Sequence, residues 1–416
     1  MKKNTQRSLT RVLIIGQSGL EKTKYLKEVQ KNLEEKGLKL LYDTVGHKMI
    51  ELYNRGILYH RGITEKTILN LPRDSLELLE RQAWQEIITS LNDIQADFHV
   101  INTHAVFRWD HGLIPVIDID LLIQYKPNLI VCLIDDIVNI QHNLIQKGIF
   151  KFNLWELFVW REEEMWLGKF MSKFLYKLTG KPIPYYILPK RQGPFLFSQI
   201  LLNPDLPKVY MSFPITGLSE EERREIDSFK REVTSDLIAF DPFAIRDREI
   251  TFHYYSIEEE IKKALAEAVE LLESKKKDLS QESWEIYVDE DTPLSLIKFK
   301  NLKSLGFPET EVLGREHLMA IRAIDAQIIA RDYLLIDQSD FIIIYIKDDN
   351  GRPRISAGCQ SELTYAYTHG KEVNVIYKRG ERALSPWVTQ FSNVFRSVNE
   401  CLQYVKDKYI KGGEGQ

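Results

Sequence analysis

Residues 331–366 read Arg331-Asp-Tyr-Leu-Leu-Ile-Asp-Gln-Ser-Asp340, Phe341-Ile-Ile-Ile-Tyr-Ile346, Lys347-Asp-Asp-Asn-Gly-Arg-Pro-Arg-Ile-Ser356 and Ala357-Gly-Cys-Gln-Ser-Glu-Leu-Thr-Tyr-Ala366. The run from Phe341 to Ile346 is short, apolar and rich in β-branched residues, and it is bounded by Asp and Lys. This pattern predicts a buried strand of a parallel sheet. A polar turn follows and leads into a predicted helix from Leu363 to Thr368, so the stretch predicts a strand-loop-helix unit of an α/β sheet.

Two carboxylates accompany this unit. Asp332 is expected to close the helix before the strand, and Glu362 to lie in the first turn of the helix after it. Because one unit carries both, we expect them at the same edge of the sheet. Paired carboxylates serve glycosidic chemistry, in which one attacks or stabilises the anomeric carbon and the other handles a proton. The alternative is structural, with Glu362 as a favourable charge near a helix N-terminus and Asp332 as a solvated helix-end residue.

Ser356 and Gly358 stand where the strand is expected to hand over to the helix. A hydroxyl and unpaired backbone N–H groups at such a point suit an anion or the hydroxyls of a sugar.

The order Arg-Asp, Asp before a strand, then Ser-x-Gly-x-x-x-Glu resembles the nucleoside 2-deoxyribosyltransferase family, and within it the nucleoside 5′-monophosphate N-glycosidases. The resemblance spans about residues 207–410. It implies that Ser356 and Gly358 hold the 5′-phosphate, that Glu362 is the nucleophile and that Asp332 is the acid/base partner. The implied reaction is hydrolysis of the N-glycosidic bond, or transfer of the sugar to a second base, without a cofactor.

The first strand of this half is predicted at Lys208 to Ser212. In the family a similar strand ends in a loop that wraps sugar and phosphate, with a tyrosine beside the nucleophile, and the corresponding residues are Tyr210, Ser212, Thr216 and Gly217. Asp241 follows the next predicted strand, and ligands of such sheets bind outside the carboxyl ends of the strands. We therefore expect Asp241 at the substrate site. A tight strand-to-helix turn would explain Pro214 and Gly217 equally well.

The N-terminal half predicts a second ligand site. The strand Arg11-Val-Leu-Ile-Ile15 is followed by Gly16-Gln-Ser-Gly19-Leu-Glu21-Lys22-Thr23 and a helical pattern. This order predicts a phosphate-binding loop for ATP or another nucleotide: Gly16 and Gly19 shape the backbone, Lys22 reaches the terminal phosphates and Thr23 holds Mg²⁺. Glu21 departs from the usual motif, which has glycine before the lysine, and adds negative charge near the phosphates.

Two later segments, Phe98 to Ala105 and Lys126 to Asp136, resemble those of archaeal-type adenylate kinases and their nucleoside-kinase relatives. In that family a strand ends in Asp-Thr-His, whereas this chain has Asn102 in place of the aspartate, so phosphoryl transfer and simple nucleotide binding both stay open. The resemblance covers about residues 9–190. It implies that Trp160 to Glu164 form a lid whose Arg161 reaches phosphate, although an amphipathic helix with a solvated charge run is the alternative.

A chain of 416 residues, 44% of them hydrophobic, is long enough for two domains with their own cores. We predict two doubly wound, parallel-sheet α/β domains. A P-loop kinase-like domain is expected at 1–190, a linker at 191–206, and a deoxyribosyltransferase-like domain of Rossmann or flavodoxin-like type at 207–416. An insertion at about 251–313 departs from the compact family and is interpreted as a lid, a dimerisation arm or an interdomain clamp.

The net charge of -4 and the scattered lysines and arginines argue against a nucleic-acid surface. No run approaches the length of a membrane span, the N-terminus does not fit a signal peptide, and the three cysteines are scattered as in a reducing compartment. We expect a cytoplasmic homo-oligomer, a dimer, that binds a nucleoside or nucleotide. Two other functions stay open: a nucleoside or nucleotide kinase, and a nucleotide-sensing regulator or defence effector whose P-loop domain gates the glycosidase.

Overall fold

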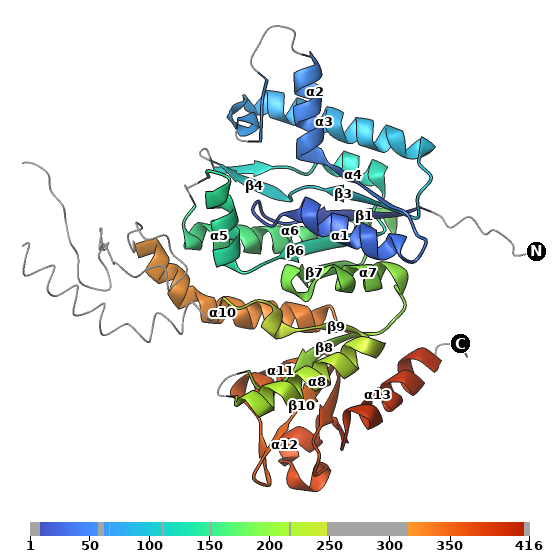
Figure 1. Ribbon diagram of the computed structural model, residues 1–416, viewed down its shortest axis with the longest axis vertical. Helices are drawn as coiled ribbons and strands as arrows, with labels where there is room; N and C mark the ends of the chain where they lie inside the picture. Colours follow the sequence, from blue (N-terminus) through green and yellow to red (C-terminus); the bar gives the residue numbers. More distant parts are fainter. Residues whose placement is uncertain are drawn as a thin grey trace, which may run out of the picture. The chain divides into compact units, whose positions relative to one another are not determined.

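The computed structural model describes residues 9–56, 62–65, 67–109, 112–149, 152–215, 218–247 and 315–411. The chain forms two α/β domains, each built around a five-stranded, all-parallel sheet (Figure 1). The predicted fold class is therefore confirmed. The predicted insertion at 251–313 lies outside the described residues.

The N-terminal sheet has the strand order β2-β3-β1-β6-β7. Its strands are β1 (Thr10–Ile15), β2 (Leu40–Thr44), β3 (Phe98–Asn102), β6 (Leu129–Ile134) and β7 (Tyr185–Pro189). All residues of β3 and β6 are buried, as expected of strands that are covered on both faces. The central strand β1 carries the glycine loop at its carboxyl end, where ligands of parallel sheets bind.

Helices and a hairpin surround this sheet: α1 (Lys22–Glu34), α2 (Val45–Gly56), α3 (Arg73–Ser90), α4 (Ile119–Tyr125), α5 (Ile137–Gln146), α6 (Leu154–Thr179), α7 (Pro194–Leu202), β4 (Val106–Trp109), β5 (Gly112–Pro115), and the 3₁₀ turns η1 (Ile68–Asn70), η2 (Leu91–Asp93) and η3 (Lys190–Gln192). Helix α7 packs against α1, and the rings of Tyr25 and Phe197 stack with centroids 6.4 Å apart. The segment 191–206, expected to be a linker, thus contains a helix that packs on the N-terminal domain.

The C-terminal sheet has the order β14-β13-β10-β8-β9. Its strands are β8 (Lys208–Ser212), β9 (Ile238–Phe240), β10 (Phe341–Tyr345), β13 (Glu372–Ile376) and β14 (Asn393–Phe395). Counted along the chain this is the flavodoxin-like order, in which the connections leave β8 and β10 in opposite directions. The switch point between these two neighbouring strands is where the fold opens a crevice for a ligand.

The other elements of this half are α8 (Glu220–Asp236), η4 (Pro242–Ala244), α10 (Arg315–Asp337), the hairpin β11 (Lys347–Asp349) and β12 (Arg352–Arg354), α11 (Ala357–Thr368), η6 (Glu381–Ala383), α12 (Pro386–Thr389), α13 (Val398–Lys406) and η7 (Asp407–Lys411). On one face of the sheet, Val209 and Met211 of β8 join an apolar core with residues of α8 and α13. Because successive side chains of a strand point to opposite faces, Tyr210 and Ser212 face the other side.

By contacts within the chain, the molecule divides into two compact units. One comprises Met1–Ile134, Glu163–Ala244 and Arg331–Gln416 and contains both sheets. The other comprises Asp135–Glu162 and Ile245–Ala330, and includes α5 and the first part of α6. Among the described helices, none combines the length and the apolar character needed to cross a membrane.

Candidate functional site

The carboxylate of Glu362 lies against the end of β8. The Tyr210 hydroxyl donates a hydrogen bond of 2.7 Å to Oε1, and the Ser212 hydroxyl donates one of 2.5 Å to Oε2. Residues 210 and 212 share a face of the strand, so one strand supplies both donors. Helix α11 begins at Ala357, which places Glu362 in its second turn and not in its first, as the sequence had predicted.

The start of α11 lies close to this carboxylate. Ser356 is the N-cap, and its Oγ accepts a hydrogen bond of 3.1 Å from the N–H of Cys359. A Cβ added at the exposed Gly358 would meet only Ser356 Oγ, at 3.7 Å. No described residue accepts a hydrogen bond from the N–H groups of Ala357 and Gly358. The helix N-terminus therefore keeps donors and space for an anion.

Asp332 is buried on α10, and it does not end this helix as predicted, because the helix continues to Asp337. The Arg331 guanidinium holds the Asp332 carboxylate: Nε and Nη2 donate to Oδ1 at 3.1 and 2.9 Å. Nη2 also donates to the carbonyl of Pro242 at 3.2 Å. Arg331 thus joins α10 to the loop after β9.

A third carboxylate, Asp241, follows β9 and is buried. Lys230 of α8 approaches its Oδ2 at 2.5 Å, and the N–H of Phe243 donates to Oδ1 at 2.9 Å. The Lys230 ammonium also lies 5.4 Å from the centroid of the Phe213 ring, a cation-π contact. Asp241 therefore carries its own cation within the site.

Burial and the neighbouring charge of Asp332 raise the pKa of Glu362 to about 7, although the hydrogen bonds from Ser212 and Tyr210 and the charge of Arg331 lower it. Burial also raises the pKa of Asp332, while Arg331 lowers it and Asp241 raises it. Burial and the two carboxylates raise the pKa of Tyr210 well above its usual value, so its hydroxyl stays protonated and remains a donor. Glu362 and Asp332 are thus electrostatically coupled, which is common at catalytic sites.

Sequence reasoning missed Arg331 and Lys230. Arg331 precedes Asp332 directly, and neighbouring side chains on a helix point about 100° apart, so adjacency gave no sign of their contact. The bond to Pro242, 89 residues away in sequence, reveals that Arg331 belongs to the site. Lys230 likewise meets Asp241 only through the packing of α8 on β9. Thr216 and Gly217, predicted for the same loop, lie outside the described residues.

The glycine loop after β1 has the backbone that its sequence requires. Gly16 has φ +142°, and a Cβ there would lie 2.5 Å from the Leu133 carbonyl oxygen, so only glycine fits. Gly19 also has positive φ, at +86°. The Lys22 ammonium bonds to the carbonyl of Gly16 and approaches that of Gln17 at 3.3 Å. Lys22 therefore lies inside the loop that was predicted to bind phosphate.

Glu21, the residue that departs from the motif, is the N-cap of α1 in the left-handed region with φ 53°. Its carboxylate pairs with Lys190 of η3 at 3.2 Å. Thr23 is the second residue of α1 and is half-buried. Asn102, at the end of β3, donates from Nδ2 to Thr44 Oγ1 at 3.1 Å.

Arg161 belongs to the second compact unit, whereas the glycine loop belongs to the first. It is buried, and its Nη1 donates to Asp247 Oδ2 at 2.7 Å and to the carbonyl of Asp135 at 3.2 Å. This ion pair engages the guanidinium, and a contact of Arg161 with phosphate stays a prediction.

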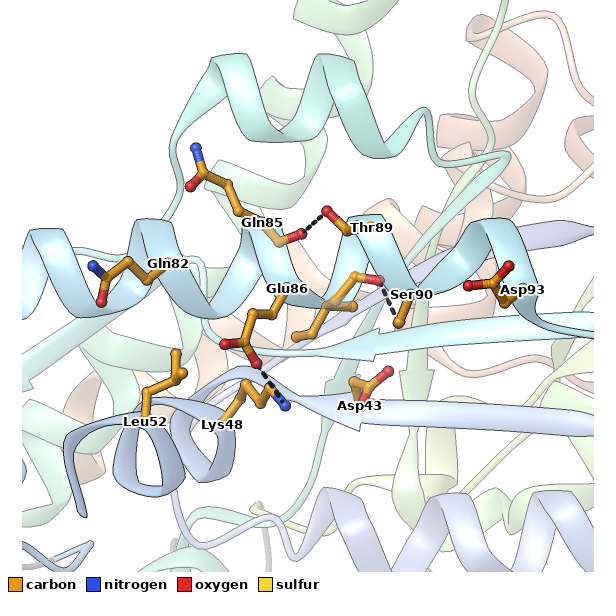
Figure 2. Close-up of a pocket in the computed structure, with 10 residues that line it drawn as sticks. Asp43, Lys48, Leu52, Gln82, Gln85, Glu86, Thr89, Ser90 and Asp93 are labelled. Carbon is orange, nitrogen blue, oxygen red and sulfur yellow. Dashed lines mark hydrogen bonds and ion pairs between the residues drawn. The ribbon is translucent and has the colours of Figure 1, made fainter. Parts of the chain in front are cut away.

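A polar groove of about 680 Å³ lies between α2 and α3 in the N-terminal half. Figure 2 shows Lys48 reaching Glu86 across it, at 3.0 Å. None of the predicted site residues lines it. Among the described residues, no cluster of three or more His, Cys, Asp or Glu side chains is arranged to hold a metal ion.

Comparison of the chain with protein-family models gives no match, and comparison with curated proteins gives none either. The resemblances to deoxyribosyltransferases and to adenylate kinases therefore stay predictions, and the geometry of the two sites carries the functional argument.

The raised pKa of Glu362 predicts how the free energy of unfolding depends on pH. The shift from 4.5 to about 7 favours the neutral carboxyl, so its stabilising contribution is present below pH 4.5 and is lost as the pH rises through 7. Glu362→Gln cannot ionise, so above about pH 8 it should be more stable than the natural protein by about 2 to 3 kcal/mol, relative to their difference at about pH 4. Urea unfolding followed by circular dichroism measures this difference.

The exposed Glu381→Gln serves as the control, and its stability should follow that of the natural protein at every pH. A difference between Glu362→Gln and the natural protein that does not change with pH would contradict the buried, coupled carboxylate.

Proposed function

We propose that the C-terminal domain hydrolyses the N-glycosidic bond of a (deoxy)nucleoside 5′-monophosphate. The observation that supports this proposal is the pair of buried, coupled carboxylates, Glu362 and Asp332, at the switch point of the parallel sheet. Two hydroxyls orient Glu362, so its carboxylate is preorganised to face a developing positive charge.

In the proposed reaction, an oxygen of Glu362 attacks C1′ of the sugar. The bond from C1′ to the base breaks, and the base nitrogen takes a proton from Asp332. Water then attacks C1′ of the glycosyl ester and gives its proton to Asp332, and the Glu362 carboxylate leaves. Both transition states resemble an oxocarbenium ion, which a nearby carboxylate stabilises.

The phosphate of the substrate is assigned to the start of α11. Ser356 and Gly358 lie there, and the N–H groups of Ala357 and Gly358 have no acceptor among the described residues. Such a helix N-terminus favours a dianion. This placement supports a monophosphate over an unphosphorylated nucleoside.

For the N-terminal domain we propose nucleotide binding with slow phosphoryl transfer or none. Binding needs the backbone loop and the charge of Lys22, and Thr23 is available for Mg²⁺, whereas transfer also needs an ordered metal and a positioned acceptor. Asn102 stands in place of an acidic residue that would organise the metal, and its amide is engaged with Thr44.

A specific contact favours the gated glycosidase as the second candidate function. The turn η3 that holds Glu21 through Lys190 also carries Gln192. Gln192 donates from Nε2 to the carbonyl of Ala239 at 2.9 Å and accepts at Oε1 from the N–H of Asp241 at 3.2 Å. A nucleotide that changes the pairing of Glu21 therefore has a direct connection to the strand end beside the glycosidase site.

We expect the natural protein to release free base from at least one member of a panel of nucleosides and nucleoside 5′-monophosphates, with the base detected by chromatography. Glu362→Ala should lower the rate by about a thousandfold or more, since the nucleophile is lost. Glu381→Ala, which removes an exposed glutamate of the same domain, should leave the rate unchanged. Near-full activity of Glu362→Ala, or no base release from any substrate, would show that the proposed reaction is wrong.

Ser356→Ala should raise KM about tenfold or more for a monophosphate and much less for the matching nucleoside, because a hydrogen bond to a charged group is lost. The substitution also removes the cap of α11, which costs about 1 kcal/mol. Ser397→Ala controls for that loss, since Ser397 caps α13 through a bond of 3.2 Å from the N–H of Glu400. Equal effects of Ser356→Ala on both substrates would argue against a bound 5′-phosphate.

Calorimetry of the full chain with a non-hydrolysable ATP analogue and Mg²⁺ tests the P-loop. Lys22→Ala should weaken binding about tenfold or more, since a charge-assisted contact to phosphate is removed. Glu21→Gly should strengthen binding, because it removes a like charge at a left-handed position that glycine adopts without strain. The exposed Lys24→Ala is the control. Unchanged affinity in both variants would mean that the loop holds no phosphate, and rapid phosphoryl transfer to a nucleoside or monophosphate would favour the kinase.

A further inference from the structure

The geometry around Asp332 gives a role to Arg331, which the proposed reaction does not yet use. The side chain of Arg331 is 4% exposed, so its guanidinium is almost fully removed from water. A buried cation is unfavourable unless charges and hydrogen bonds compensate it. Arg331 has both: Nε and Nη2 meet Asp332 Oδ1, and Nη2 also meets the Pro242 carbonyl.

The two residues are adjacent on α10, and adjacent helix positions do not normally face each other. Here the carbonyl of Pro242, from a different element, draws the guanidinium over the Asp332 carboxylate. Both nitrogens bond to the same oxygen, Oδ1. The described residues give Oδ2 no hydrogen-bond partner, so Oδ2 is the atom that remains to give or take a proton.

The three carboxylates of the site differ in the cations beside them. Lys230 neutralises Asp241, and Arg331 neutralises Asp332. Glu362 has only the neutral hydroxyls of Tyr210 and Ser212. The charged and titratable groups around the pair are Tyr210 of β8, Cys359 of α11, Arg331 of α10, Asp241 after β9 and, through Asp241, Lys230 of α8.

Burial disfavours both ionised carboxylates, and each disfavours the ionisation of the other. Of the groups around the pair, Arg331 is the cation that favours ionisation of both. Without it, Glu362 and Asp332 would each keep a proton to higher pH, and a protonated Glu362 is not a nucleophile. With it, the pair can hold a single proton near neutral pH.

We propose that Arg331 is a positioning residue of the C-terminal site: it holds Asp332 by Oδ1, leaves Oδ2 for proton transfer and supplies the charge that lets Glu362 ionise while Asp332 carries the proton. This inference rests on the proposed glycosidase. It adds a residue whose effect on the reaction passes through Asp332 and Glu362, without contact to the substrate.

The test compares pH–rate profiles of base release for the natural protein, Arg331→Met and Arg331→Lys. Arg331→Met should move the acid limb of kcat/KM up by about one pH unit or more, which lowers the rate on that limb about tenfold for each unit. Arg331→Lys keeps the charge, so the acid limb should stay near its natural position while kcat falls, because one ammonium cannot replace the two-nitrogen contact. Lys408→Met, which removes a cation paired with Glu372 in the same domain, should leave the profile unchanged.

A second measurement does not need the reaction. The pH at which the stability contribution of Glu362 is lost follows from unfolding of each background with and without Glu362→Gln. This midpoint should rise by about one pH unit or more in Arg331→Met and stay in place in Arg331→Lys. Should Arg331→Met fail to fold, Asp332→Asn is measured instead, and there the midpoint should fall, because a like charge beside Glu362 is removed.

The outcomes separate the two proposals. A shifted midpoint without base release from the natural protein would support the role of Arg331 and overturn the glycosidase. An unmoved midpoint, or an Arg331→Met profile lowered equally at every pH, would mean that Arg331 only supports the fold and would overturn this inference. With Asp332→Asn as the substitute, an unmoved midpoint would remove the coupling on which the inference depends.

Discussion

The C-terminal site depends on the two hydrogen bonds that Tyr210 and Ser212 donate to the carboxylate of Glu362. Taking a carboxylate out of water is unfavourable unless donors replace the water. Both donors come from alternate positions of β8, and β10 and β9 flank this strand on either side. The site therefore exists only if β8 is central in the sheet and α11 packs with Glu362 toward it.

The same strand builds the hydrophobic core. Val209 and Met211 pack on one face of β8 with side chains of α8 and α13, while the hydroxyls occupy the other face. A shift of β8 by one residue would exchange the two faces, which would bury the hydroxyls in the core and remove both donors from Glu362. Core packing and site geometry thus select the same register, in which Val209 pairs with Phe341.

In the N-terminal half the constraint is backbone conformation. The loop after β1 passes so close to the Leu133 carbonyl that residue 16 has to be glycine. Glu21 adopts the left-handed conformation, and Lys190 holds its carboxylate. This pairing provides a physical account of the departure from the usual motif, because a cation offsets the charge that glycine would not have brought. It also ties the loop to η3, whose Gln192 bonds to the end of β9.

Local sequence determined the strands, the glycine loop and the candidate catalytic residues. Short β-branched runs such as Phe341 to Ile346 are recognisable because a parallel strand is buried on both faces. Ser356 could be placed at the start of a helix, since its hydroxyl replaces a backbone acceptor within a few residues. Strand alternation also placed Tyr210 and Ser212 on one face, and Glu362 was identified from its spacing after Ser356.

Tertiary structure alone decided which charges meet. Arg331 reaches Asp332 because Pro242 lies opposite, Lys230 neutralises Asp241 across two elements, and Arg161 pairs with Asp247. The helix limits that moved Glu362 to the second turn and Asp332 into the helix body were also decided by packing and capping around them. Periodicity and caps act within a few residues and are therefore written locally. Ion pairs between residues far apart in sequence depend on the register and packing of whole elements, which no local pattern encodes.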